Sequence, residues 1–474
     1  MQQPAFKFLN LFRCRTRKIL YIHTNLNQMR KIQLILILIL FVSTVSAKKN
    51  DGWTSLFNGK DLKGWHQLNG EAKYHVEKGE IVGTTVSNTP NSFLATDQDY
   101  GDFILELDLL VANDMNSGIQ FRSLSKPDVM NGRVHGYQCE VDPSTRAWSG
   151  GIYDEARRGW LYTGELNVVA KPAFKLGQWN HYRIECVGSS IRTWLNGVPV
   201  AYVLDNVTPK GLIALQVHSI GKDDQPGKQI RWKNIRIKTT GLKATETPDV
   251  FVVNLLPNTL CQAEKEQGWK LLFDGTTTNG WKGVGMNQFP SHGWTVTDGN
   301  LMAVANSVEI NGKGVDIVSD EKYAAFEFQF EFNMAEGANS GVKYFTGNGG
   351  PSIGLEYQIL DDKKHPDAKM GVVGNRTMAS LYDLIPADKQ ERFTKPAGEW
   401  NIGRIVVYPD NRVEHWLNGM KVVEYVRGSN IYRALVARSK YESFDQFGMV
   451  KQAPILLQYH NDQVKFRSLK IKNL

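Results

Sequence analysis

The stretch Gly52-Trp53-Thr54-Ser55-Leu56-Phe57-Asn58-Gly59 returns later in the chain as Gly268-Trp269-Lys270-Leu271-Leu272-Phe273-Asp274-Gly275. In both places another tryptophan, Trp65 or Trp281, stands 12 residues after the first. Further paired landmarks follow in the same order: Asn-Ser-Gly at 116 and 339, Tyr-Gln at 137 and 357, Tyr-Asp at 153 and 382, Trp-Asn at 179 and 400, Trp-Leu-Asn-Gly at 194 and 416, and Gln-x-His at 216 and 458. A colinear series of this kind predicts a duplicated domain and argues against a short-period solenoid.

The repeat sets the expected domain organisation of the 474-residue chain. We expect an N-terminal extension with a signal peptide at 1–47, a first domain at 48–240, a linker at 241–266 and a second domain at 267–474. Each copy, at about 200 residues, is long enough to bury a core of its own.

The net charge of +8 comes almost entirely from the N-terminal segment. Seven basic residues and no acidic residue precede Lys48, which leaves 49 basic and 48 acidic residues in the rest of the chain. A nearly neutral protein has no electrostatic basis for binding a polyanion, so the composition argues against a nucleic-acid partner.

The segment that starts at Met29 has the pattern of a secretory signal peptide. Arg30 and Lys31 precede an apolar run over 32–42, and Val45-Ser46-Ala47 is typical of a cleavage site. We expect cleavage after Ala47 and export to the periplasm or the outside, with residues 1–28 as an upstream extension. A membrane anchor is the alternative, although the run is shorter than the roughly 20 residues that a spanning helix needs.

The three cysteines after the leader, Cys139, Cys186 and Cys261, show no paired spacing. They predict neither a disulfide framework nor a zinc site. Cys139 and Cys186 lie in strand-like runs, where a buried and inert thiol is the expected state.

Alternation of polar and apolar residues dominates both copies, as in the runs 103–109, 230–237 and 326–332. This period of two predicts strands with one buried face. Asn-Gly pairs at 196–197 and 418–419 are typical of hairpin turns. Many short antiparallel strands indicate an all-β chain of two-sheet jelly-roll sandwiches, with one concave sheet open to ligands.

The ordered motifs resemble a family of secreted bacterial domains, the 3-keto-disaccharide hydrolases. The resemblance rests on 52–65, 116–122, 136–142, 151–161 and the Trp-Leu-Asn-Gly and Gln-x-His motifs in the first copy, and on 355–362, 365–368, 379–383 and 396–401 in the second. It implies two tandem concanavalin A-like β-sandwiches joined by a linker. It also implies a carbohydrate-cleaving enzyme whose substrate carries a ketone at C3 of the sugar.

Such a ketone acidifies the hydrogen on C2, so one base can remove that proton and the glycosidic oxygen on C1 can leave by elimination. Water then adds to the unsaturated sugar, and the sum is hydrolysis. The route requires a base near C2, donors for the enolate oxygen and an acid for the leaving group. It differs from an ordinary glycosidase, which uses two facing carboxylates.

Candidate catalytic residues follow from strand alternation. In the first copy, Gln138, Glu140 and Asp142 should project from one face, with Glu140 as base and Asp142 as its partner or acid. An ordinary solvated outer face is the alternative. In the second copy, Glu356 and Asp362 are the corresponding candidates.

Aligning the two Tyr-Gln pairs places Leu360 where Glu140 stands and Glu356 where Gly136 stands. The copies are then chemically different at this strand. Either the carboxylate has moved along the strand or one copy has another role.

His218 and His460, each two residues after a glutamine, are the remaining catalytic candidates, because neutral imidazoles can accept or donate protons near neutral pH. A structural hydrogen bond is the alternative for both. Substrate contacts are expected from polar and aromatic neighbours: Arg122, Gln138, Tyr153, Asp154, Arg158, Trp160 and Gln216 in the first copy, and Lys343, Gln358, His365, Tyr382 and Gln458 in the second. Trp160 could stack on a sugar ring or pack against its own sheet.

We expect no cofactor. A calcium ion near Asp361, Asp362 and His365 stays open, although their spacing matches no standard loop. Four interpretations of the function compete: cleavage of 3-keto-glycosides in one or both copies, a lectin-like carbohydrate-binding protein, one active copy beside one binding copy, and a standard glycosidase on unoxidised sugar, which would need two facing carboxylates. The sequence specifies neither the sugar nor the oligomeric state.

Overall fold

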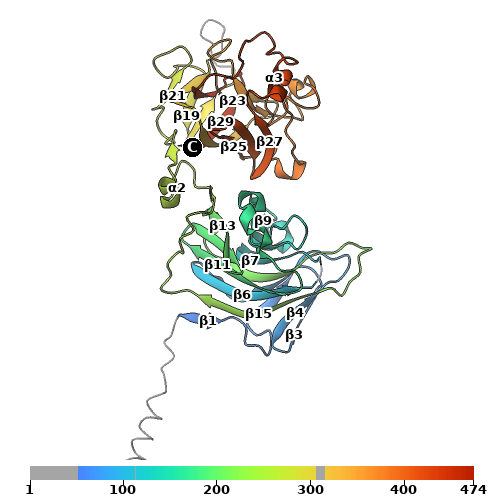
Figure 1. The fold of residues 1–474 in the computed structure, drawn as a ribbon. Helices are drawn as coiled ribbons and strands as arrows, with labels where there is room; N and C mark the ends of the chain where they lie inside the picture. Colours follow the sequence, from blue (N-terminus) through green and yellow to red (C-terminus); the bar gives the residue numbers. More distant parts are fainter. Residues whose placement is uncertain (1–51, 113, 306–314) are drawn as a thin grey trace, which may run out of the picture. The chain divides into compact units, whose positions relative to one another are not determined.

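The computed structural model describes residues 52–112, 114–305 and 315–474, and these residues form two β-sandwiches (Figure 1). The prediction of an all-β fold with two tandem sandwiches is confirmed. The signal peptide and the upstream extension lie outside the described residues, so cleavage after Ala47 and export stay predictions. No helix in the described part of the chain combines the length and apolarity needed to cross a membrane.

The first sandwich consists of a nine-stranded and a seven-stranded sheet. The larger sheet runs in the order β16 (Val252–Asn254), β13 (Val198–Leu204), β12 (Ser190–Leu195), β11 (Trp179–Val187), β6 (Phe103–Val111), β15 (Gln229–Lys238), β4 (Glu80–Thr84) and β3 (Lys73–Glu77), with β1 (Trp53–Ser55) paired to β15. The smaller sheet runs in the order β10 (Gly159–Tyr162), β9 (Ile152–Glu155), β8 (His135–Val141), β7 (Ser117–Leu124), β14 (Leu212–Val217), β5 (Ser92–Thr96) and β2 (Trp65–Leu68).

The second sandwich repeats this strand order in an eight-stranded and a five-stranded sheet. The larger sheet runs in the order β19 (Trp294–Thr297), β20 (Asn300–Ala303), β29 (Val464–Asn473), β22 (Phe326–Met334), β25 (Asn401–Val407), β26 (Arg412–Leu417) and β27 (Met420–Val426), with β17 (Lys270–Leu271) paired to β29. The smaller sheet runs in the order β18 (Trp281–Gly283), β21 (Ile317–Tyr323), β28 (Ala453–Leu457), β23 (Asn339–Tyr344) and β24 (Leu355–Leu360).

In the part of the chain that the structure describes, helical structure is confined to short segments. They are α2 (Gln262–Glu266), α3 (Asn430–Val436) and the 3-10 turns η1 (Met130–Gly132), η2 (Gly164–Leu166), η3 (Val168–Ala173), η4 (Pro366–Lys369) and η5 (Glu391–Phe393). The Asn-Gly hairpins form as expected: Asn196 and Asn418, like the glycines after them, have positive φ, as the tight two-residue turn requires.

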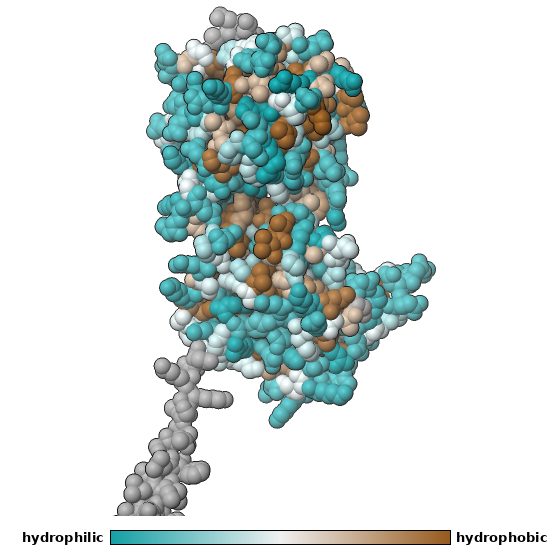
Figure 2. All heavy atoms as spheres, in the orientation of Figure 1, coloured by the Kyte–Doolittle hydropathy of each residue, from teal (hydrophilic) through white to brown (hydrophobic). Residues whose placement is uncertain are grey.

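Strand alternation places the apolar side chains between the sheets. Phe326, Phe328, Phe330 and Phe332 of β22 are all fully buried in the core. On the outer face of β6 in the first sandwich, Glu106 is buried in a different way, because Arg183 and Arg236 cover it with ion pairs. The molecular face in Figure 2 is accordingly mostly hydrophilic, with only small groups of hydrophobic residues.

The segment between the repeats is part of the folded structure. Its strand β16 adds to β13 in parallel, and Val250 and Val253 join the first core. Within α2, Glu264 accepts hydrogen bonds from the Asn254 side chain (2.8 Å) and from Lys470 of β29, with Glu264 and Lys470 each 2% exposed or less. The linker segment therefore makes strand pairs and a buried ion pair.

We predict that Glu264→Ala lowers the free energy of unfolding by about 3–5 kcal/mol, because it leaves the Lys470 ammonium buried without a counter-charge. The double variant Glu264→Met/Lys470→Met should recover most of this loss. Denaturant unfolding measures both, with the exposed Glu266→Ala as control. Equal stability of Glu264→Ala and the control would contradict the prediction.

Candidate active site

Each sandwich has a cavity on the outward face of its smaller sheet. In the first, core packing of Tyr137 and Cys139 turns Gln138 and Glu140 of β8 to the opposite face, where they line a cavity of about 380 Å³. In the second, the same alternation on β24 turns Glu356 into a cavity of about 310 Å³. The expected projection of these side chains from one open face is found in both copies.

The cavities share a set of equivalent residues from adjacent strands. The pairs are Asn116 and Asn339, Gln216 and Gln458, His218 and His460, and Tyr153 and Tyr382. The catalytic candidates His218 and His460 and the expected substrate contacts Gln138, Gln216, Tyr153, Trp160, Lys343, Gln358, Gln458 and Tyr382 all line a cavity.

Strand register corrects the alignment of the two carboxylates. Gly118 of the first Asn-Ser-Gly motif pairs with Glu140, whereas Gly341 of the second motif pairs with Gln358. Glu140 therefore corresponds to Gln358, and the equivalence with Leu360 that the Tyr-Gln motifs suggested is wrong by two residues.

The same register assigns the other carboxylate. Gln120 pairs with Gln138, and at the same positions Lys343 pairs with Glu356. Glu356 thus occupies the place of Gln138, not that of Gly136. Along the strand, the first copy carries glutamine and then glutamate, and the second copy carries them in the reverse order.

Glu140 is a buried carboxyl group held by amide donors. It is 4% exposed, and its two oxygens accept hydrogen bonds from Asn116 Nδ2 (2.6 Å) and Gln138 Nε2 (3.0 Å). The Arg146 guanidinium lies 3.9 Å away. Desolvation is the largest influence and raises the pKa of Glu140 to about 7, against the lowering effect of the amide donors.

Asp142, expected as the partner or acid of Glu140, is not among the residues that line the cavity. It lies just beyond β8, is 3% exposed and accepts hydrogen bonds from Ser144 Oγ (2.6 Å) and Arg146 Nε (2.7 Å). Its two oxygens are occupied by this loop and by the Trp148 amide (3.2 Å). Asp142 therefore positions Arg146, which does line the cavity.

Two groups of the first cavity have unused hydrogen-bonding capacity. Gln216 donates to Gln138 Oε1 (3.0 Å), while its own buried Oε1 has no partner among the described residues. His218 Nδ1 lies 2.7 Å from the Ser219 carbonyl, which can only accept, so Nδ1 donates this hydrogen bond and, in the neutral ring, Nε2 is the acceptor. Trp160 forms one wall, edge-on to Tyr153 with 5.2 Å between ring centroids.

Three residues expected to bind substrate in the first copy have structural roles instead. Arg122, 1% exposed, donates to the Gly101 and Gly188 carbonyls and to Asp102, away from the cavity. Asp154 is fully buried and holds Arg158 by an ion pair.

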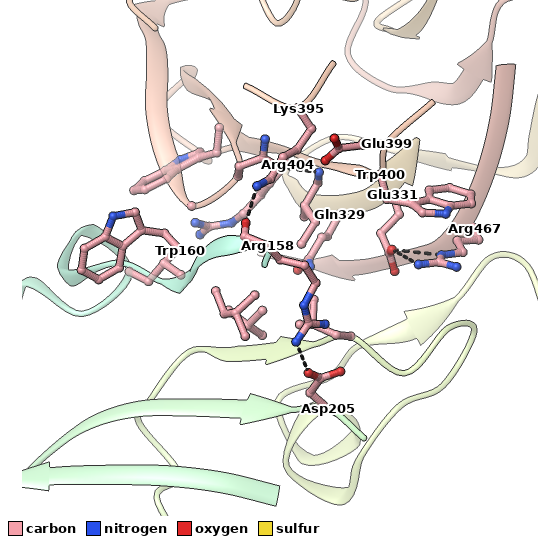
Figure 3. Close-up of a pocket in the computed structure, with 18 of the residues that line it drawn as sticks. Arg158, Trp160, Asp205, Gln329, Glu331, Lys395, Glu399, Trp400, Arg404 and Arg467 are labelled. Carbon is pink, nitrogen blue, oxygen red and sulfur yellow. Dashed lines mark hydrogen bonds and ion pairs between the residues drawn. The ribbon is translucent and has the colours of Figure 1, made fainter. Parts of the chain in front are cut away.

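Arg158 lines a separate cavity of about 440 Å³. Figure 3 shows it there with its guanidinium directed at Asp205, to which it donates. The ion pairs with Asp154 and Asp205 fix the Arg158 side chain next to β9. Arg158 therefore does not reach the cavity of Glu140.

Glu356 in the second cavity sits in a more basic environment than Glu140. It is 4% exposed, 3.8 Å from Lys343 Nζ, and accepts from Gln458 (3.3 Å) when that amide is oriented to satisfy both of its ends. Desolvation raises its pKa, while Lys343 and Lys440 oppose the shift. Gln358 donates weakly to Asn339 (3.4 Å), and its buried Oε1 has no partner in the described part of the chain.

Two predicted residues of the second copy lie outside its cavity. Asp362 forms an ion pair with Lys389 (2.7 Å) and accepts from the Met378 amide (2.7 Å), so it fixes a loop and is not placed as an acid. His365 caps η4 by accepting from the Asp367 amide (3.1 Å). Its ring centroid is 6.4 Å from that of His460, which does line the cavity.

The described residues were expected to offer at most a calcium site near Asp361, Asp362 and His365. Among the described residues, no three His, Cys, Asp or Glu side chains converge on a point that could hold an ion. Asp361, the remaining candidate for calcium, accepts from the Gly337 (2.8 Å) and Lys363 (3.0 Å) amides, so its oxygens are already engaged.

Several cavity residues were not identified from the sequence. Asn116 and Asn339 were visible as repeated motifs, and their position opposite the carboxylate strand could have indicated a role. Arg146 is placed by Asp142, and Lys440 comes from a segment after β27 that has no counterpart in the first copy. No repeat signal could have identified these two.

Comparison with known proteins shows which family the chain resembles in sequence. The family model of the 3-keto-alpha-glucoside-1,2-lyase-like domain matches residues 52–238 and 268–472. The 3-keto-disaccharide hydrolase of Bacteroides thetaiotaomicron is 34% identical over 232 residues, covering 44% of this chain and 79% of that protein.

Among solved structures, a candidate glycosyl hydrolase from Parabacteroides distasonis is 29% identical, with a TM-score of 0.40 over 46% of this chain and 99% of that chain. A carbohydrate-binding module from Bacillus subtilis is 17% identical, with a TM-score of 0.27 over 37% of this chain and 95% of that chain.

These findings confirm the predicted class, a glycoside-cleaving hydrolase. Since the family model covers both sandwiches and most of the chain, the protein belongs to the family of 3-keto-alpha-glucoside-1,2-lyase-like domains, of which it carries two in tandem.

Proposed function

We propose that the first sandwich cleaves 3-keto-glycosides with Glu140 as the general base. The observation that carries the proposal is the buried carboxyl group of Glu140 in the cavity, whose pKa is raised to about 7. A base with this pKa is half ionised at neutral pH and strong enough to remove a proton made acidic by a neighbouring ketone.

The proposed reaction starts when Glu140 takes the proton from C2 and the electron pair moves onto the C3 oxygen. Arg146 supplies positive charge near the resulting enolate. The enolate then forms the C1–C2 double bond as the bond from C1 to the glycosidic oxygen breaks. Glu140, now protonated, is the nearest acid for the departing oxygen, and water adds across the double bond to complete hydrolysis.

The hydroxyl groups of the sugar have matching partners in the cavity. The unpaired Gln216 Oε1 and the His218 Nε2 can each accept a hydroxyl hydrogen, and Trp160 offers an aromatic wall. These contacts orient the ring without adding a second ionised acid or base.

An ordinary two-carboxylate glycosidase fits the first cavity less well. The other lining carboxylate, Glu155, is paired with Arg133 at 2.9 Å. On β9 it stands opposite Gly136, four residues from Glu140, which separates the two backbones by roughly 13 Å. A two-carboxylate mechanism needs a second carboxyl group free to act, whereas Glu155 is held by Arg133.

The second sandwich is proposed to bind a sugar without cleaving it. Gln358, an amide, occupies the place of Glu140, and Glu356 is neutralised by Lys343 at 3.8 Å. The strand therefore offers no free carboxylate at the position that serves as base in the first copy. This assignment corresponds to one active and one binding copy.

Glu140→Gln should lower kcat on a 3-keto-glycoside by between about a hundredfold and ten-thousandfold, because it removes the proton acceptor. Glu356→Gln, the matched change in the second copy, should retain most of the activity. Proton NMR should show solvent deuterium entering C2 with wild type and with Glu356→Gln, but not with Glu140→Gln. Loss of activity in Glu356→Gln with retention in Glu140→Gln would reverse the assignment of the two copies.

The pH profile of kcat/KM should rise through pH 7, because Glu140 must be ionised to accept a proton. Asn116→Ala removes a hydrogen bond that lowers the pKa of Glu140, so it should move this rise to higher pH. Asn339→Ala, the equivalent change in the second copy, is the control. An unchanged profile in Asn116→Ala would argue that another group titrates.

The free energy of unfolding should also depend on the ionisation of the Glu140 carboxyl group. The folded-state pKa of about 7 is above the ordinary value of 4.5, so the contribution of Glu140 to stability is lost as pH rises from about 4.5 through 7. Glu140→Gln should match wild type near pH 4 and be more stable near pH 8, by about 3 kcal/mol at most. Denaturant unfolding at the two pH values tests this, and a pH-independent difference would contradict it.

A further inference from the structure

The second cavity differs from the first mainly in charge. Where the first has the Gln120–Gln138 amide pair (2.7 Å), the second has the buried ions Lys343 and Glu356, which balance each other. Where the first has the Glu140 carboxyl group, the second has the neutral Gln358. At these equivalent positions, the second cavity therefore carries one negative charge fewer than the first.

The second cavity has also gained a cation. The chain between β27 and β28 extends over 427–452 and includes α3, whereas the equivalent connection in the first copy, between β13 and β14, covers only 205–211. The longer segment brings Lys440, Tyr441 and Phe444 to the cavity.

Lys440 has no carboxylate within ion-pair distance among the described residues. Its ammonium group lies over the Tyr382 ring, 4.1 Å from the centroid, and 5.2 Å from that of Tyr441. These aromatic contacts orient the cation without neutralising it. In the first cavity, Arg133 and Arg146 each have a carboxylate partner, while the exposed Arg392 has none among the described residues.

We propose that the second cavity binds a sugar unit that carries an oxyanion, a carboxylate or a sulfate ester, with Lys440 as its counter-charge. The proposal builds on the function proposed for the second sandwich, which is sugar binding without cleavage. The cavity of about 310 Å³ suits one sugar unit, and the unpaired Gln358 Oε1 can accept from a hydroxyl group. Tyr441 and Phe444 supply apolar contact for the ring.

Direct binding of unoxidised sugars to the full chain tests this, because such sugars bypass the keto-dependent reaction. We would titrate glucose, glucuronate and glucose 6-sulfate by ligand-detected NMR at low and high salt. The anionic sugars should bind about tenfold more tightly than glucose at low salt, as expected for one charge-assisted hydrogen bond, and the advantage should shrink at high salt. Preference between glucuronate and glucose 6-sulfate identifies the oxyanion.

Lys440→Gln should abolish the advantage of the anionic sugars while leaving glucose binding unchanged. Lys451→Gln, an exposed lysine of the same segment, is the matched control and should behave as wild type. Equal binding of glucose and the anionic sugars, or a preference that survives in Lys440→Gln, would overturn the proposal. A Lys440-dependent preference in a chain that fails to cleave any keto-glycoside would uphold it and refute only the proposed catalysis.

Discussion

Buried polar side chains on the outward face of each smaller sheet must satisfy one another, and the site depends on this constraint. Gln120, Gln138 and Gln216 form a connected set of hydrogen bonds beneath the first cavity. An unpaired buried polar group costs about 1–3 kcal/mol, so such a set tolerates few single changes. Glu140 joins this set through Gln138, and its two amide donors do not offset the loss of water. That residual cost keeps its pKa near neutrality.

The same constraint explains how the copies diverged. Replacing Gln120 alone by lysine would bury an uncompensated charge, and replacing Gln138 alone by glutamate would do the same. The second copy has both changes at once, as Lys343 and Glu356, and so exchanges an amide pair for an ion pair without changing the net charge. With that pair in place, Gln358 can stand where the base stands in the first copy.

Much of the architecture could be predicted from the sequence, because alternation and repeated motifs report directly on strands and duplication. The faces of Glu140 and Glu356 were predictable for the same reason. Their register was not: sliding a strand by two residues leaves every side chain on its original face, so the shared Tyr-Gln pair aligned well at the wrong position. Only the pairing of Gly118 and Gly341 with the neighbouring strand resolves the shift.

Charged residues were the least predictable part of the site, because their partners decide whether they reach a ligand. Arg122, Asp154 and Arg158 appeared suited to bind a sugar, yet each is used in an ion pair that holds the fold. Lys440 could not be recognised from the sequence, because the segment that carries it has no equivalent in the first copy. In the structure it lines the second cavity and has no carboxylate within ion-pair distance among the described residues. A charge is available for binding where the fold leaves it unneutralised, and that depends on contacts far apart in the sequence.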